Sequence, residues 1–296
     1  MKRDRNKEYQ TRQDIKMAIR RLLPNWFLGL IRRRQVSLQK MLGFLNEPRV
    51  LPPEKEVFNS LAVVLPCYGH ARYLPLAFES IIRQTRPPEE VIIIDDRSPD
   101  NTAEVIGQLI SEYKQSGANQ IKFIVQTNNK NLGQCASINK AVELSESDLV
   151  MIMNDDDYLM EDAVETMFDL FQKNPQIALI GGSNVGFTED NILLKKPKKI
   201  KDYPGGDPVK LAITTPKDAL AFEDYCSLNM THSSSTFVRI KGVAAGLYRP
   251  KKDRLVPFSD RDFQIRINLL YSVGTNVLVP FCFWRSDSSV DSGRYS

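Results

Sequence analysis

Residues 61–102 read LAVVLPCYGHARYLPLAFESIIRQTRPPEEVIIIDDRSPDNT, and this stretch decides the fold. It contains two apolar runs rich in Val, Leu and Ile, at 61–65 and 91–94, which flank an amphipathic segment at 74–84. Continuous apolar runs of this length are typical of β-strands that are covered on both faces. The stretch therefore predicts a strand, a helix and a second strand parallel to the first, joined by a right-handed crossover.

The same alternation continues downstream. Further apolar runs lie at 121–125, 149–153 and 177–180, and helical segments are predicted at 102–113, 135–144 and 161–172. Asp100 is a suitable N-cap for the first of these helices. The pattern predicts an α/β domain over residues 58–296, with a mainly parallel central sheet flanked by helices. The late runs at 277–279 and 281–284 are predicted to form an antiparallel addition to the sheet.

Residues 1–57 differ in character and are predicted to form a basic helical extension that ends in a linker. Residues 1–60 contain 14 Lys and Arg against 6 Asp and Glu, a net charge of +8, so the other residues carry −4. The segment 14–34 mixes apolar residues and cations at roughly helical spacing, which suits contact with an anionic membrane surface. It suits equally a helix packed on the domain with its arginines in water. Residues 47–56, with three prolines, are predicted to be the linker.

Histidine and cysteine are scarce, and this limits the metal chemistry. The chain has two histidines, His70 and His232, and its four cysteines form no CxxC pair. A metal is therefore expected to be held by oxygen ligands, which favours Mg²⁺ or Mn²⁺. No zinc site or disulfide framework is indicated, so a reducing compartment is expected. His70 is expected to cap or pack near the first predicted helix.

No apolar run approaches the roughly 20 residues that a membrane span needs, and the N-terminus lacks the core of a signal peptide. The protein is therefore expected in the cytoplasm, and on the inner face of the cell membrane if segment 14–34 binds lipid. A basic run at 195–201 is expected to be a solvated loop or a contact for a phosphorylated lipid. Nucleic acid is not an expected partner, because the domain is net acidic and carries no recognisable module.

Acidic side chains follow two of the predicted strands. Asp155, Asp156 and Asp157 are consecutive, and such carboxylates repel one another unless a cation neutralises them. A divalent metal that bridges two phosphates does so, whereas a solvated turn before the next helix is the simpler alternative. Asp95 and Asp96 could bind a base or ribose, or cap a helix. Because ligands bind beyond the carboxyl ends of parallel strands, these groups are expected to meet at one edge of the sheet.

Four blocks of sequence occur in a characteristic order. The first is VVLPCYGHARYLPLAFESIIRQT at 63–85, and the second is VIIIDDRSPDNT at 91–102. The third is NLGQCASIN at 131–139, and the fourth is MIMNDDDYLMEDAVE at 151–165. In this order they resemble glycosyltransferase family 2, a large inverting family with the GT-A fold, and the resemblance extends over about residues 61–284. Four ordered blocks are far more specific than any one of them alone.

The resemblance implies roles for individual residues. Pro66 and Tyr68 would line the pocket of the base, and Asp96 would bind a uracil-like base or the ribose. Asp156 matches the position that ligates the metal, with Asp157 beside it near the metal or donor sugar. For the nucleotide sugar the implied residues are Pro66, Tyr68, Asp95, Asp96, Asn131, Gly133 and Asp155.

A late block, VPFSDRDFQIRI at 256–267, resembles the segment that carries the family's catalytic base. Inverting transfer needs a base opposite the leaving nucleotide to deprotonate the acceptor hydroxyl. Asp260 is predicted to be that base, with Asp262 in reserve and Arg266 downstream, and an N-cap role is the alternative. His232 is a candidate for contact with donor phosphate or acceptor, or for a bond to backbone, and Arg285 for contact with phosphate.

Several positions depart from the family pattern. Asn154 stands where the family has its first aspartate, Ser259 replaces a glutamate, Gly69 an asparagine and Ile138 a frequent arginine. The resemblance implies metal-dependent, inverting transfer of a sugar, favouring a UDP-sugar donor, to a glycan or lipid-linked acceptor in bacterial polysaccharide or glycolipid synthesis. An inactive nucleotide-sugar-binding partner of another transferase is the alternative. A sugar nucleotidyltransferase is disfavoured, because the Gly-rich basic loop after the first strand is missing.

Overall fold

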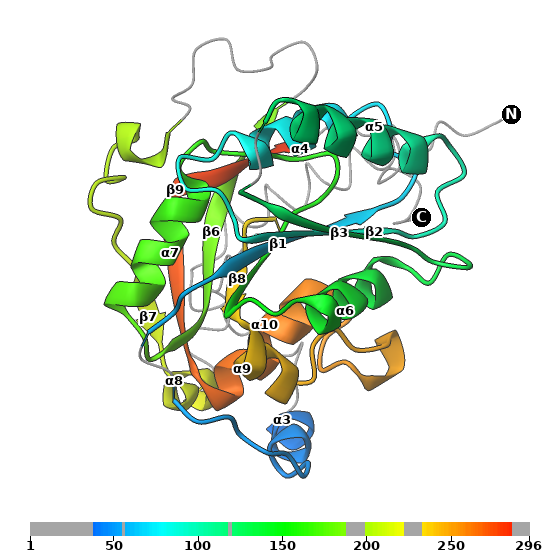
Figure 1. Cartoon of the computed structure of the whole chain (residues 1–296). Helices are drawn as coiled ribbons and strands as arrows, with labels where there is room; N and C mark the ends of the chain where they lie inside the picture. The colour runs from blue at the N-terminus through cyan, green and yellow to red at the C-terminus, as the bar shows by residue number, and fades with distance from the viewer. Residues whose placement is uncertain (1–37, 55–56, 118–119, 188–198, 222–232, 286–296) are drawn as a thin grey trace, which may run out of the picture.

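The structure is a computed structural model that describes residues 38–54, 57–117, 120–187, 199–221 and 233–285. The segment 14–34, His232 and residues 195–198 of the basic run lie outside the described residues. One sheet crosses the molecule, and helices lie on both of its faces (Figure 1). The predicted α/β class is confirmed.

The described strands form one sheet. Its order is β3 (Lys122–Thr127), β2 (Glu90–Asp95), β1 (Leu61–Cys67), β4 (Leu149–Ile152), β8 (Thr236–Val238), β6 (Ile177–Phe187), β9 (Ser272–Arg285) and β5 (Tyr158–Leu159), and β7 (Ala212–Thr214) pairs with β9. Strands β1 to β4 are parallel, as the sequence predicts. Strand β8 runs antiparallel to both β4 and β6, so the sheet is mixed beyond β4.

The late apolar runs belong to one strand of 14 residues, β9. It is antiparallel to β5 and β7, as predicted, but it runs parallel to its longest neighbour, β6. The predicted antiparallel addition is therefore correct for two of its three pairings. The parallel pairing brings the end of β9 to the same side of the sheet as the end of β6.

Helices sandwich the parallel half of the sheet (Figure 1). On one face lie α4 (Leu74–Ile82), α5 (Thr102–Gln115) and α7 (Ala163–Lys173), and on the other lie α6 (Gln134–Leu144) and α10 (Ser259–Leu270). The shorter helices are α3 (Leu38–Leu45), α8 (Pro216–Ala221) and α9 (Arg239–Ala244), with single 3₁₀ turns η2 (Ile200–Asp202) and η3 (Lys251–Asp253). None of the described helices is long and apolar enough to span a bilayer.

The packing of strand β1 explains why its sequence does not alternate between apolar and polar residues. Val63 and Leu65 pack into the cluster under α4 and α5, whereas Ala62 and Val64 pack into the cluster under α6 and α10. Both faces are covered, so every position is apolar. The two clusters pack the sheet between the helix layers.

Strand β3 and the start of α5 differ in detail from the prediction. β3 is an edge strand whose residues are mostly exposed, and Val125 is 46% exposed, so it is not covered on both faces. Asp100 lies one residue before the N-cap of α5, but its carboxylate accepts hydrogen bonds from the N–H of Thr102 at 3.2 Å and its hydroxyl at 2.6 Å. It therefore still satisfies a free donor at the helix start.

The described part of the predicted extension packs on the domain. Met41 and Phe44 of α3 are buried against Ile265 and Leu269 of α10, in a third apolar cluster. Glu47 follows α3 and accepts two hydrogen bonds from the guanidinium of Arg249, at 3.0 and 2.5 Å. Residues 38–47 therefore pack against α10 and are hydrogen-bonded to Arg249, in the segment before that helix.

Candidate active site

The carboxyl ends of three parallel strands meet at one edge of the sheet. Cys67 at the end of β1 lies opposite Asp95 of β2, and Val64 lies opposite Ile152 of β4. The loops after these strands therefore start side by side. Thr236 begins β8 at the same edge, because β8 is antiparallel to β4. The edge thus gathers the polar groups that follow β1, β2 and β4 with those that precede β8.

Asp96 organises the loop in front of α6. It is 3% exposed, and its Oδ1 accepts hydrogen bonds from the Asn128 side chain and the Leu132 N–H, both at 2.8 Å. Its Oδ2 accepts the Gly133 N–H at 2.7 Å, and that N–H is also 3.0 Å from the side-chain oxygen of Asn131. The predicted nucleotide residues Asp96, Asn131 and Gly133 therefore form one hydrogen-bonded unit. Their contact with a nucleotide stays a prediction.

The loops after β1 and β2 are tied together beside this unit. Pro66 is buried inside β1, and Tyr68 is half-buried at the start of the loop that follows. The carboxylate of Asp95 accepts the Ser98 N–H at 3.0 Å, and the Ser98 hydroxyl accepts the Gly69 N–H at 3.1 Å. The structure therefore places Pro66, Tyr68 and Asp95 next to one another at the predicted edge.

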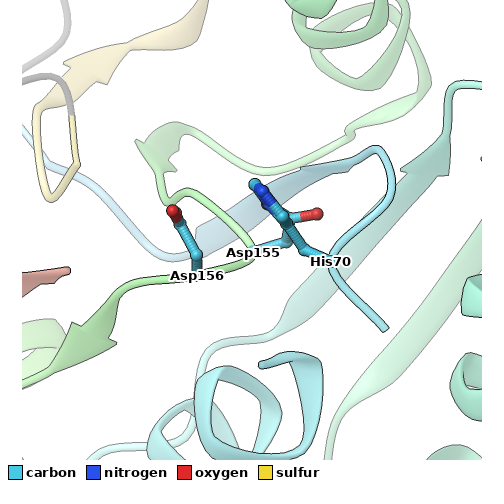
Figure 2. Close-up of side chains that lie close together, drawn as sticks. All are labelled: His70, Asp155 and Asp156. Carbon is cyan, nitrogen blue, oxygen red and sulfur yellow. The ribbon is translucent and has the colours of Figure 1, made fainter. Parts of the chain in front are cut away.

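His70, Asp155 and Asp156 form a cluster of potential metal ligands (Figure 2). One oxygen of Asp155 accepts the Tyr68 N–H at 3.0 Å, and the other is 2.8 Å from Nδ1 of His70. One donor atom from each of the three clustered side chains lies within 4.8 Å of the others. Carboxylate oxygens suit Mg²⁺ and Mn²⁺, and imidazole is a common ligand of transition ions. The cluster therefore fits a divalent cation.

Asp157 is bound to the protein through both of its oxygens. Oδ2 accepts hydrogen bonds from the Asn154 side chain, at 3.0 Å, and from the Ser233 hydroxyl, and Oδ1 accepts the backbone N–H of Arg285 at 3.1 Å. Burial and then the charge of Asp156 raise the pKa of Asp157 to about 7, against the effect of these donors. With its oxygens so engaged, Asp157 fits a cation less well than the two aspartates before it.

Arg285 lies beneath the acidic loop, at the end of β9. Its Nε donates to the backbone carbonyl of Asp156 at 3.2 Å. The guanidinium carbon lies 4.0 Å from the ring centroid of Tyr73 and 4.7 Å from that of Phe187. Arg285 is 3% exposed, so the loop rests on a buried cation held between two aromatic rings. The predicted phosphate contact stays a prediction, and this supporting role was not indicated by the sequence.

Asn154, the position that departs from the family, is a junction in the same network. Its side-chain oxygen accepts a hydrogen bond from Gln134 at the start of α6, at 2.9 Å, and its backbone N–H donates to the Ser233 hydroxyl at 3.1 Å. Gln134 and Ser233 carry no sequence signal of their own, because amides and hydroxyls are common on any surface. Their role follows only from where the fold places them.

Asp260 lies in the first turn of α10 and is partly exposed. Burial, and then the charge of Asp260, raise the pKa of Tyr248, whose ring stacks on that of Phe263 in α10 with 5.0 Å between the ring centroids. Tyr248 is joined to Asn139 of α6 by two hydrogen bonds, at 2.8 and 3.0 Å. The start of α10 therefore faces α6, whose first residue, Gln134, contacts the acidic loop.

Asp262 and Arg266 form an ion pair inside the domain, and both are 0% exposed. Arg266 Nε donates to Asp262 at 2.9 Å, and the other oxygen of Asp262 accepts the Leu255 N–H. Arg266 also donates to the carbonyls of Ala245 and Leu247. A carboxylate enclosed in this way cannot reach an acceptor, so the geometry contradicts the prediction of Asp262 as a reserve base. Its role is to hold α10 to the segment before it.

Comparison with known sequences gives one family and several relatives. The family described as Glycosyl transferase family 2 matches residues 62–225. The poly-beta-1,6-N-acetyl-D-glucosamine synthase of Staphylococcus epidermidis is 27% identical over 138 residues, which cover 47% of this chain and 32% of that protein. The chain thus spans about a third of the length of this relative.

Two solved structures resemble this one in fold. S. aureus TarS 1-349, in complex with UDP-GlcNAc, has a TM-score of 0.55 at 16% identity, over 80% of this chain and 62% of that chain. The mannosyltransferase PcManGT from Pyrobaculum calidifontis, in complex with GDP-Man and Mn²⁺, has a TM-score of 0.53 at 16% identity, over 88% and 65%. At such low identity the likeness concerns the fold alone.

Proposed function

This chain belongs to glycosyltransferase family 2, and from that membership we propose that it transfers a sugar, with inversion, from a nucleoside diphosphate to a hydroxyl group. Its fold is the GT-A fold of its solved neighbours. The proposed donor is a UDP-sugar. Complexes of those neighbours with UDP-GlcNAc and GDP-Man support a nucleotide sugar as the class of donor.

One observation carries the proposal: the groups such a reaction needs gather at one edge of the sheet. The loop after β1 with Tyr68, the unit built on Asp96 and the acidic loop with Asp156 start from adjacent strand ends. Asp260, in the first turn of α10, is proposed to complete this set from the side of α6, and its contact with the edge stays a prediction. A nucleotide bound along β1 and β2 would therefore have its diphosphate near the acidic loop and its sugar toward α10.

The acidic loop is proposed to hold a divalent cation, Mg²⁺ or Mn²⁺, through Asp156 and Asp155. Such an ion neutralises a diphosphate leaving group when it is bound. The chain's own contribution is to keep the loop rigid, through Asp157, Asn154 and Arg285. Rigid placement of ligands matters, because a preorganised site needs no rearrangement as charge develops on the leaving group.

Asp260 is proposed to act as the base. The oxygen of the acceptor hydroxyl attacks the anomeric carbon, and its proton passes to the Asp260 carboxylate. The bond from the anomeric carbon to the diphosphate breaks, and its electron pair leaves with the nucleoside diphosphate. Attack from the face opposite the leaving group inverts the anomeric configuration.

The acceptor is proposed to be a glycan or a lipid-linked glycan, in polysaccharide or glycolipid synthesis at the cytoplasmic face of a membrane. The Staphylococcus epidermidis relative is a polysaccharide synthase by name, which supports this setting. The excess of cations in residues 1–60 suits attraction to an anionic surface.

The test is a transfer assay with the full chain. UDP-N-acetylglucosamine, UDP-glucose and GDP-mannose are supplied with oligosaccharide and polyprenyl-phosphate-linked acceptors, with Mn²⁺, Mg²⁺ or EDTA. We expect metal-dependent release of nucleoside diphosphate with at least one donor, and NMR of the product to show an inverted anomeric centre. Asp260→Asn should lower transfer by about 10²- to 10⁴-fold, and Asp156→Ala should abolish it.

Matched controls are Asp253→Asn, an exposed aspartate shortly before α10, and Asp169→Ala, exposed on α7. Both should transfer at the rate of the unmodified chain. Undiminished transfer by Asp260→Asn or Asp156→Ala, in folded protein, would remove that residue from the mechanism.

A second candidate is a nucleotide-sugar-binding partner without activity, favoured by the altered positions Asn154 and Ser259. The two candidates differ in one measurement. Calorimetric binding of a nucleotide sugar without release of nucleoside diphosphate, across the whole acceptor panel, would favour the inactive partner.

A further inference from the structure

His70 is held against the acidic loop by the turn that follows β1. Its Nδ1 lies 2.8 Å from an oxygen of Asp155, and the two side chains are 13% and 8% exposed (Figure 2). The loop and the turn are also joined through the backbone, because the N–H of Tyr68 donates to the other oxygen of Asp155 at 3.0 Å. The turn that carries His70 is therefore joined to both oxygens of Asp155.

The spacing of the three side chains suits a shared cation. Neighbouring ligands of an octahedral ion with bonds of about 2.1 Å are separated by about 3 Å. The 2.8 Å between His70 Nδ1 and the Asp155 oxygen is close to that value, and Asp156 offers an oxygen within 4.8 Å of both. A hydrogen bond between His70 and Asp155 has the same length, so this distance is compatible with ligation as well as with a hydrogen bond.

The rest of the acidic motif has little left to offer a metal. Asp157 is engaged by three donors, and the side chain of Asn154 is used by Gln134 and by Asp157. Two positions of the loop therefore serve to build the site and not to ligate. A nitrogen ligand from His70 would compensate for the missing carboxylate at position 154.

We infer that His70 is a direct ligand of the divalent cation, and that it makes the site prefer Mn²⁺ to Mg²⁺. This inference rests on the proposed function, and it differs from the expectation that the metal is held by oxygen ligands. Mg²⁺ takes oxygen ligands in a strict octahedron and gives up its water reluctantly, whereas transition ions accept imidazole. The predicted packing of His70 near the first helix is compatible with this role, since its ring lies 5.8 Å from that of Tyr73.

The test uses electron paramagnetic resonance of Mn²⁺ bound to the full chain with UDP. The chain has two histidines, so histidine-specific ¹⁵N labelling reports on His70 and His232 alone. In pulsed experiments the labelled chain should show a ¹⁵N coupling to Mn²⁺. The coupling should be absent in His70→Gln, where only His232 carries the label, and present in His232→Gln.

Metal preference gives a second readout, independent of catalysis. The Mg²⁺ concentration that displaces half of the bound Mn²⁺ should fall at least about tenfold in His70→Gln and stay unchanged in His232→Gln. Glutamine keeps an N–H that can donate to Asp155, so a His70 that only orients Asp155 would leave the preference near that of the unmodified chain.

The outcomes separate the inference from the proposed function. Loss in His70→Gln of both the ¹⁵N coupling to Mn²⁺ and the preference for Mn²⁺ over Mg²⁺ supports direct ligation. Bound Mn²⁺ without histidine coupling, or coupling that survives in His70→Gln, overturns it. Release of nucleoside diphosphate by the unmodified chain, measured on the same sample, reports on the proposed function whichever result is found.

Discussion

The side chains of Asn154 and Asp157 are joined by a hydrogen bond of 3.0 Å, across the loop that carries the predicted metal ligands. The donor is the amide of Asn154, and the acceptor is a carboxylate that is 1% exposed. An aspartate at position 154, as the family pattern has it, would place two carboxylates in contact at this point. The amide at position 154 therefore supplies a hydrogen bond to Asp157 that an ionised aspartate could not donate.

Asn154→Asp restores the family residue and is expected to weaken the protein. The change removes a donor from a buried carboxylate and adds a like charge, which should lower the free energy of unfolding by about 1–3 kcal/mol. Urea unfolding at pH 8 measures the effect. Asn101→Asp, at an exposed asparagine before α5, is the control and should be close to neutral. Equal or greater stability of Asn154→Asp would contradict the explanation.

Asp262→Asn tests the structural role of the buried ion pair. It leaves the Arg266 guanidinium buried and without its counter-ion, so the free energy of unfolding should fall by about 3–5 kcal/mol. Breaking an exposed pair of the same i,i+4 spacing, through Glu79→Gln beside Arg83, should change it by no more than about 1 kcal/mol. Loss of transfer in Asp262→Asn with unchanged stability would return Asp262 to the list of catalytic candidates.

The raised pKa of Asp157 predicts a pH dependence of stability in metal-free protein. The pKa rises from an ordinary 3.8 to about 7 on folding, so the native state binds this proton more tightly than the unfolded chain. Its contribution to stability is full below about pH 4 and is lost as the pH rises through 7. Asp157→Asn cannot titrate and should show a flatter decline between pH 4 and 7.5. Melting temperatures in EDTA measure this, and parallel curves for the two proteins would refute it.

Gly133→Ala tests the unit built on Asp96. Gly133 has φ of +85° and ψ of 155°, a region that is essentially restricted to glycine, so alanine should destabilise the protein by about 1–3 kcal/mol. It should also weaken UDP binding, measured by calorimetry, if this loop contacts the nucleotide. Gly107→Ala is the matched control: it lies in α5 with open space around it, and should stabilise the helix by about 0.5–1 kcal/mol. Unchanged stability of Gly133→Ala would show that the loop conformation is not fixed.

The parallel half of the fold could be predicted from sequence because its signals are local. Strands β1, β2 and β4 are buried at every position, and the apolar runs within them follow directly from coverage on both faces. From the ends of these strands, the sequence could also predict that Tyr68, Asp96 and the acidic loop lie at one edge of the sheet. The exposure of β3 could not be predicted in this way, because a short apolar run does not reveal whether a strand lies at an edge of the sheet.

The remaining features depend on contacts between distant parts of the chain. Asp262, Arg266 and Asn268 are polar residues on a helix that is buried almost all around, so helical periodicity could not show which of them face the interior. Arg285 contacts Asp156 from 129 positions away, and no local pattern reports that distance. The sequence could place an acid at the start of α10, but not decide whether Asp260 or Asp262 was accessible.

The hydrogen bond from the backbone of Arg285 to Asp157 spans 128 positions of the chain. During synthesis, the ribosome makes the acidic loop long before β9 exists to support it. Until β9 docks, the carboxylate of Asp157 lacks one of its hydrogen-bond donors, and the acidic loop lacks its contact with the guanidinium of Arg285. A nascent chain that has completed the parallel strands therefore still lacks two supports of the acidic loop, and the proposed metal affinity should emerge late in translation, together with the last strand.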